Sequence, residues 1–105
     1  MTEEDRALIV HQVRNAAEDR IIITHGTDTM AVTARTLTDI KGKVIVLTGA
    51  MQPASLRSSD SVFNVGFAFA AVQLLPDGVY VAMNGRIFDA AHVTKDRAAG
   101  RFVAE

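Results

Sequence analysis

The sequence predicts an α/β fold, a three-layer αβα sandwich around a mostly parallel sheet. Two runs of branched apolar residues, 21–23 and 44–47, contain no polar positions, which is typical of strands covered on both faces. Segments with helical spacing precede, separate and follow these runs. The order α-β-α-β-α-β plus a tail then predicts right-handed crossovers, with helices on both faces of the sheet.

The chain is expected to begin with an amphipathic helix over residues 3–18. Thr2 and Asp5 approximate a capping box, and Ile9 and Val13 recur at helical spacing, which predicts both the start of the helix and its buried face. The first strand, 21–23, follows directly.

A second helix is expected between the two apolar runs. Met30, Ala34 and Leu37 have helical spacing over about three turns, and one of residues 27–29 is expected to begin the helix. Gly42 breaks the chain before the strand at 44–47.

The second half predicts one long helix and one further strand. Residues 48–60, TGAMQPASLRSSD, read as a loop that ends with Ser59 or Asp60 as the helix cap. The helix 62–75 is apolar almost all round, so we expect the sheet on one side and a second partner on the other. A turn at 76–78 leads to a strand at 79–83. After a turn at Asn84 and Gly85, we interpret the tail as loop, with a short strand as the alternative.

Length and composition restrict the class of protein. The 105 residues, nearly half of them apolar, are expected to form one core and no second domain. The net charge is −1 with scattered Lys and Arg, so nucleic-acid binding is not predicted. The longest apolar stretch, 65–75, is shorter than the roughly 20 residues of a membrane helix. The chain has no Cys, and its acidic start lacks an apolar signal-peptide core, so we expect a cytoplasmic protein.

Polar residues gather where two expected parallel strands end. Ligands bind at the carboxyl ends of such strands, and these ends carry THGTDT (24–29) and TGAMQP (48–53). Thr27 and Asp28 can serve acyl chemistry near a helix start, or they can simply cap that helix. Both interpretations remain open from position alone.

The other polar candidates are weaker when each is taken by itself. Lys95 reads as a surface lysine, unless it is buried near Thr27, where a neutral amine takes a proton from a hydroxyl or from water. His25 reads as a packed loop histidine. The three histidines, His11, His25 and His92, show no metal-ligand spacing, so no metal is predicted. The polar residues of the loop read as a helix cap; they are Ser55, Ser58, Ser59 and Asp60.

Five segments together resemble the bacterial-type L-asparaginase family. They are ITHGTDTM (23–30), LTGAMQP (47–53), SDSVFN (59–64), VAMNG (81–85) and DAAHVTKD (89–96). Their order and spacing match across almost the whole chain. Gln52 stands where the family usually has Arg, and Ser61 where Gly is common.

The resemblance implies an amidohydrolase that converts L-asparagine, and sometimes glutamine, to the acid and ammonia without a cofactor. By this similarity Thr27 is the active-site threonine of the second catalytic group, and Lys95 is the base of that group. Asp28 binds the α-amino group of the substrate and helps to hold the lysine. Ala50 contributes its backbone carbonyl near the scissile amide.

The resemblance also implies a Rossmann-like or flavodoxin-like domain that is incomplete. The family has a Gly-Gly-Thr loop with another active-site threonine, a tyrosine on the loop after it, an Asp-Ser pair that binds the substrate carboxylate, and a smaller C-terminal domain. By this comparison residues 1–105 form part of the N-terminal domain and encode one of two catalytic groups. The expected partners are the amide substrate and either further copies of the chain or the remainder of the enzyme.

Two other functions are compatible with the residues. One is a non-catalytic α/β fragment or assembly piece that keeps the core of the fold but converts no substrate. The other is a small flavodoxin-like binding domain, which is disfavoured because the sequence has no Gly-rich phosphate loop.

Overall fold

The computed structural model describes residues 1–52 and 59–105 of the chain. In chain order the elements are α1 (Glu3–Asn15), β1 (Arg20–Thr24), α2 (Met30–Thr36), β2 (Val44–Thr48), α3 (Ser61–Leu74), β3 (Gly78–Met83), β4 (Arg86–Asp89), the 3-10 turn η1 (Ala90–His92), β5 (Val93–Asp96) and β6 (Arg101–Ala104). The predicted alternation of helices and strands is confirmed as far as β3.

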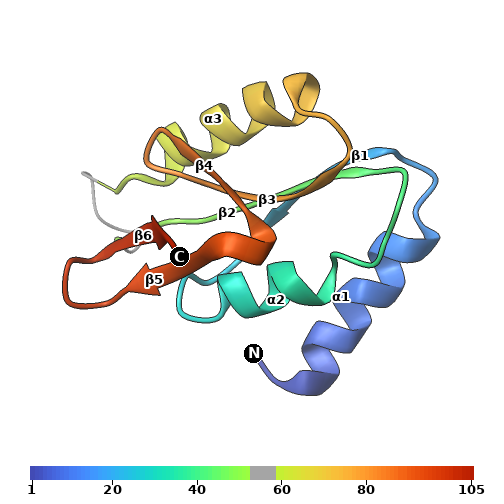
Figure 1. Ribbon diagram of the computed structural model, residues 1–105, viewed down its shortest axis with the longest axis horizontal. Helices are drawn as coiled ribbons and strands as arrows, with labels where there is room; N and C mark the ends of the chain where they lie inside the picture. Colours follow the sequence, from blue (N-terminus) through green and yellow to red (C-terminus); the bar gives the residue numbers. More distant parts are fainter. Residues whose placement is uncertain (53–58) are drawn as a thin grey trace.

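The main sheet has the strand order β1-β2-β3-β4. The first two pairs are parallel, and β4 returns antiparallel to β3. Helix α3 covers one face, while α1 and α2 lie on the other (Figure 1). Strands β5 and β6 form a separate antiparallel hairpin. The predicted α/β class with a mostly parallel sheet is therefore confirmed.

Strand β2 explains why its sequence is apolar without alternation. Successive side chains of a strand point to opposite faces. Ile45 and Leu47 belong to the core on the α1 and α2 side, whereas Val44 and Val46 pack with the α3 side. All five residues of β2 are buried, as expected for a central parallel strand.

The first helix begins as predicted and ends earlier. The capping box is present, with Thr2 and Asp5 exchanging hydrogen bonds. The prediction of helix over 3–18 is wrong beyond Asn15, because the backbone of Ala16 is extended. The ammonium group of the buried Lys43 donates to the carbonyls of Ala16 and Glu18. It thereby stabilises the non-helical chain between α1 and β1.

Helix α2 is shorter than the three turns predicted. It has 7 residues, which is about two turns. Thr29 occupies its N-cap position without a side-chain cap bond. Beyond Thr36 the chain tightens into turns, in which Leu37 N–H donates to Ala34 and Ile40 N–H to Leu37. Leu37 stays fully buried in this turn, which accounts for the helical spacing in the sequence.

The interpretation of the tail as mainly loop is wrong. The turn at Asn84 and Gly85 is confirmed by positive φ angles of 51° and 82°, which suit a tight hairpin turn. It leads into β4, and the chain then forms the β5–β6 hairpin. These strands have only 4 residues each, and most of their positions are polar or exposed, so they lack the apolar signal of a strand.

Helix α3 packs on the sheet through small residues. Ala68 and Val72 are buried there, while the opposite side of the helix exposes large apolar side chains. These are Val62, Phe63, Phe69 and Leu74, each more than half exposed. Within the described residues nothing covers this side, so the second partner expected for the helix stays a prediction.

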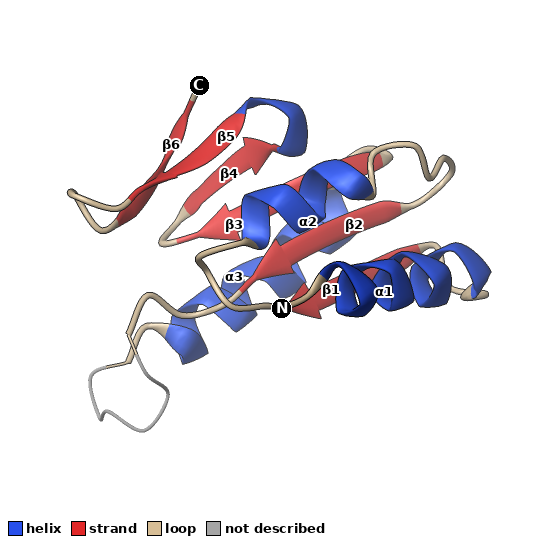
Figure 2. Cartoon of the chain, turned by 90° about the horizontal axis from the view of Figure 1, so that it is seen from below, coloured by secondary structure: helices blue, strands red, loops and turns tan. Residues whose placement is uncertain are grey.

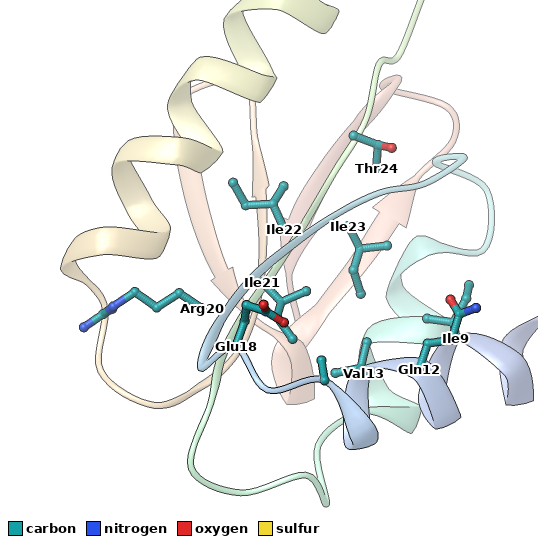
Figure 3. Close-up of a pocket in the computed structure, with 10 residues that line it drawn as sticks. Ile9, Gln12, Val13, Glu18, Arg20, Ile21, Ile22, Ile23 and Thr24 are labelled. Carbon is teal, nitrogen blue, oxygen red and sulfur yellow. The ribbon is translucent and has the colours of Figure 1, made fainter.

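A groove of about 560 Å³ lies between α1 and β1. Ile9 and Val13 of α1 face Ile21 and Ile23 of β1 across it (Figure 3). Figure 2 shows α1 in front of β1, the edge strand of the sheet, and no strand in the described parts of the chain pairs with the outer edge of β1. Among these same residues, no helix has the length and apolar character needed to cross a membrane.

Candidate active site

A lysine from the β5–β6 hairpin meets the polar loop that follows β1. Lys95 Nζ donates to Thr27 Oγ1 at 2.9 Å and to Asp28 Oδ1 at 2.7 Å. These residues are 68 and 67 positions apart in the sequence. The structure thus brings together the hydroxyl, the amine and the carboxylate that the sequence pointed to, and it supplies the contact that sequence spacing cannot show.

The three groups differ in their access to solvent. The Lys95 side chain is only 15% exposed, whereas that of Asp28 is 70% exposed; Thr27 is half-buried. The hydrogen bond from Lys95 and its positive charge, together with the charge of Arg97, lower the pKa of the Asp28 carboxyl. Asp28 is therefore held as a carboxylate that faces solvent on one side and the lysine on the other.

The β5–β6 hairpin is fixed in place by packing and by one arginine. Val93 and Phe102 are buried in the core of the α1 and α2 side. Arg35 of α2 donates from Nη1 to the carbonyl of Val93 at 3.0 Å. Val93 and Lys95 lie on the same face of β5 because side chains alternate, so this anchorage also directs Lys95 toward α2 and its preceding loop.

The loops after β1 and β2 leave the sheet side by side. Thr24 is paired with Thr48, and His25 N–H donates to the Thr48 carbonyl at 2.9 Å. A Cβ atom on Gly49 would lie 2.2 Å from the His25 carbonyl oxygen, so only glycine permits this approach. The next residue, Ala50, is half-buried and lies beside the loop that carries Thr27. Among the described residues, no hydrogen bond joins Ala50 to Lys95.

Asp60 lies at the start of α3, as predicted for Ser59 or Asp60, but its side chain organises the second loop. It occupies the N-cap position of α3 without a side-chain cap bond. Its carboxylate instead accepts hydrogen bonds from the backbone of Met51 and Gln52 and from the side chains of Asn64 and Asn84. Burial acts to raise the pKa of Asp60, but hydrogen bonds from Asn84, Met51 and Gln52 outweigh it and lower that pKa.

Asn64 and Asn84 were missed at the sequence level. Asn64 is fully buried; it donates to the Gly49 carbonyl at 2.8 Å and accepts from Asn84 N–H at 2.8 Å. The available signal was an amide side chain between apolar residues at the start of α3, four residues after Asp60. Ser59 bonds to the Gln52 carbonyl, and Ser55 and Ser58 lie outside the described residues.

The histidines do not form a metal site in the described chain. His25 is buried, and its ring contacts the Thr33 hydroxyl and the Gly26 carbonyl, consistent with a packed loop histidine. No group of three or more His, Cys, Asp or Glu side chains gathers within residues 1–52 and 59–105. The groups available for chemistry at this site are therefore a hydroxyl, an amine and a carboxylate in mutual contact.

The chain is similar to known proteins over almost its whole length. The family model "Asparaginase, N-terminal" matches residues 1–102. A probable periplasmic L-asparaginase of Haemophilus influenzae is 44% identical over 85 residues, covering 73% of this chain and 24% of that protein. A glutamyl-tRNA(Gln) amidotransferase subunit of Methanococcus vannielii is 42% identical over 83 residues, covering 77% and 19%.

A solved structure resembles the whole described fold. The probable cytoplasmic L-asparaginase from Campylobacter jejuni has a TM-score of 0.89 and 32% identity, covering 99% of this chain and 36% of its own. The chain thus spans between about a fifth and about a third of the lengths of these relatives.

Proposed function

Because this chain belongs to the asparaginase family, we propose that its Thr27, Asp28 and Lys95 take part in hydrolysis of the side-chain amide of L-asparagine to L-aspartate and ammonia. The observation that carries the proposal is the double contact of Lys95 with the Thr27 hydroxyl and the Asp28 carboxylate. No cofactor is needed for this reaction class.

Each of the three groups has a role that its position supports. In its neutral form the Lys95 amine takes a proton from the Thr27 hydroxyl, or from water held there, and so creates the nucleophile. The Asp28 carboxylate orients the amine and, on its exposed side, can receive the α-amino group of the substrate. We assign to the Ala50 carbonyl a contact near the scissile amide.

We propose that residues 1–105 form part of an N-terminal α/β domain. The chain covers only 24% and 36% of two of its relatives. This supports a site that is completed by further protein, either the remainder of the enzyme or other copies of the chain. We also propose a cytoplasmic location, since the Campylobacter neighbour bears that description. The Haemophilus relative is named periplasmic, so cell fractionation is the test of location.

The Methanococcus relative favours a second candidate function. That protein is named as part of an amidotransferase; if this chain served in such an enzyme, the amide nitrogen would pass to an acceptor rather than leave as free ammonia. Release of free ammonia from L-asparagine in the absence of any acceptor supports the hydrolase, whereas formation of aspartate that depends on an added acceptor, with the nitrogen found on that acceptor, supports the amidotransferase.

The test is ammonia release from L-asparagine and L-glutamine by the purified chain and its variants. We expect Thr27→Ala and Lys95→Met to reduce the rate by about 100-fold or more, the usual scale for loss of a nucleophile or general base. Thr29→Ala is the matched control, because this neighbouring threonine makes no side-chain cap bond. A rate that is unchanged in Thr27→Ala would refute the assigned role, and no release by the wild-type chain would favour the non-catalytic fragment.

A further inference from the structure

A buried chain of hydrogen bonds runs from α1 to the loop that carries Thr27. Arg6 Nε donates to Thr33 Oγ1 at 3.0 Å, and Thr33 Oγ1 contacts His25 Nε2 at 2.8 Å. His25 Nδ1 lies 2.6 Å from the carbonyl oxygen of Gly26, the residue directly before Thr27. We call these contacts the Arg6–Thr33–His25 chain.

The proton positions in this chain follow from the partners. The Gly26 carbonyl only accepts, so His25 Nδ1 must carry a proton and donate to it. In the neutral ring Nε2 is then an acceptor, and the Thr33 hydroxyl donates to it. Arg6 has donors only, so it supplies a hydrogen bond to the Thr33 oxygen. Each donor therefore meets an acceptor, and all the hydrogen bonds point the same way, from Arg6 through Thr33 and His25 to the Gly26 carbonyl.

All three side chains are withdrawn from solvent. Thr33 is fully buried, and Arg6 and His25 are 5% and 8% exposed. Arg6 is also paired with Glu3 on its own helix. No buried side-chain nitrogen or oxygen in the described residues lacks a partner, so loss of the Thr33 hydroxyl would leave both an arginine N–H and a histidine nitrogen unpaired. Such losses are costly in a buried site.

We propose that Thr33 is a positioning residue: through the Arg6–Thr33–His25 chain it fixes the backbone at Gly26 so that Thr27 stays in contact with Lys95. The importance of Thr33 for catalysis rests on the proposed function, whereas its effect on the backbone at Gly26 does not. Thr33 lies on α2 and touches neither Thr27 nor Lys95 in the described contacts; it acts through His25. The close approach of Gly49 to the His25 carbonyl holds the same residue from the other side.

The test compares Thr33→Val with Thr33→Ser, which retains the hydroxyl. The readout is the pKa of the Asp28 carboxyl, measured by NMR, because the contact with Lys95 keeps that pKa low. The variant Lys95→Met gives the value expected when the contact is lost completely. We expect Thr33→Val to raise the Asp28 pKa by more than half of the difference between the wild type and Lys95→Met, and Thr33→Ser to leave it near the wild-type value.

Thr36→Val is the matched control on the same helix, because the Thr36 hydroxyl bonds to the Thr33 carbonyl within α2 and lies outside the chain of contacts. It should leave the Asp28 pKa unchanged. A wild-type value in a folded Thr33→Val variant would overturn the proposal. A merely structural role of Thr33 would lower the stability without moving this pKa.

A measurement on the wild-type protein keeps the proposal testable if Thr33→Val does not fold. The nitrogen shifts of His25 should show a proton fixed on Nδ1, and a ring protonated on Nε2 alone would overturn the proposal. Neither NMR readout requires turnover of asparagine. Absence of ammonia release would therefore count against the proposed function, while the Asp28 pKa and the His25 tautomer would still decide the positioning role.

Discussion

At the scale of single residues, the site depends on one close approach between backbones. Gly49 follows β2 and lies against the His25 carbonyl, where a Cβ atom would be 2.2 Å from that oxygen and 3.0 Å from the Met30 methyl. Distances of this kind force the backbone to move. Glycine at this position therefore permits the loops of β1 and β2 to run together, which places Ala50 beside the loop of Thr27.

We predict that Gly49→Ala lowers the free energy of unfolding by about 1–3 kcal/mol or more, because added volume in a packed site displaces its neighbours. Gly66→Ala is the control: it lies in the exposed part of α3, and its Cβ would meet nothing within 4 Å. Alanine should stabilise that helix by about 0.5–1 kcal/mol. Urea unfolding of both variants measures the difference, and equal stability of the two variants would contradict the packing argument.

At the scale of elements, the Asp60 cluster links two loops and a helix. Its carboxylate binds the loop after β2 at Met51 and Gln52, the side chain of Asn64 in α3, and Asn84 in the turn between β3 and β4. Asn64 continues the link to the Gly49 carbonyl. The position of Gly49 and Ala50 thus depends on hydrogen bonds contributed by three different elements.

We predict that Asp60→Asn lowers the free energy of unfolding at neutral pH by about 1–3 kcal/mol, since several donors lose their charged acceptor. The pKa of Asp60 is lower in the folded protein than in the unfolded chain. Its contribution is therefore complete above the unfolded pKa and is lost as the pH falls through the folded pKa.

Urea unfolding at a series of pH values measures this effect. The stability difference between the wild type and Asp60→Asn should shrink on acidification. Asp19→Asn, at an exposed carboxylate outside the cluster, should show no comparable loss at neutral pH. A difference between wild type and Asp60→Asn that is independent of pH would contradict the role of the carboxylate charge.

The sequence predicts those elements whose apolar pattern is decided by burial. Residues 44–47 of β2 are all apolar because both faces of the strand are covered, and the α1 capping box is local. The β5–β6 hairpin could not be predicted, because its two strands have only 4 residues each and owe their position to Val93, Phe102 and Arg35. The meeting of Thr27 and Lys95 depends on that hairpin, and it was implied only by resemblance to a family.

At the scale of the whole molecule, two apolar surfaces remain open in the described chain. One is the groove between α1 and the outer edge of β1, and the other is the outward side of α3, with Phe63 and Phe69. Neither surface includes Thr27 or Lys95. Their exposure is consistent with a chain that spans about a third or less of its relatives, and with the proposal that further protein completes the domain.

We propose that the contact of Lys95 with Thr27 and Asp28 forms part of a site for a substrate with an α-amino group and a side-chain amide. The most direct test is a titration of the labelled chain with L-aspartate, the proposed product, followed by NMR. We predict saturable shifts centred on the amides of Thr27 and Asp28 and on the Lys95 amine, retained in Thr29→Ala and lost in Lys95→Met. Saturable binding with the same affinity and the same shifts in Lys95→Met, or shifts confined to the α1 and β1 groove, would contradict the claim.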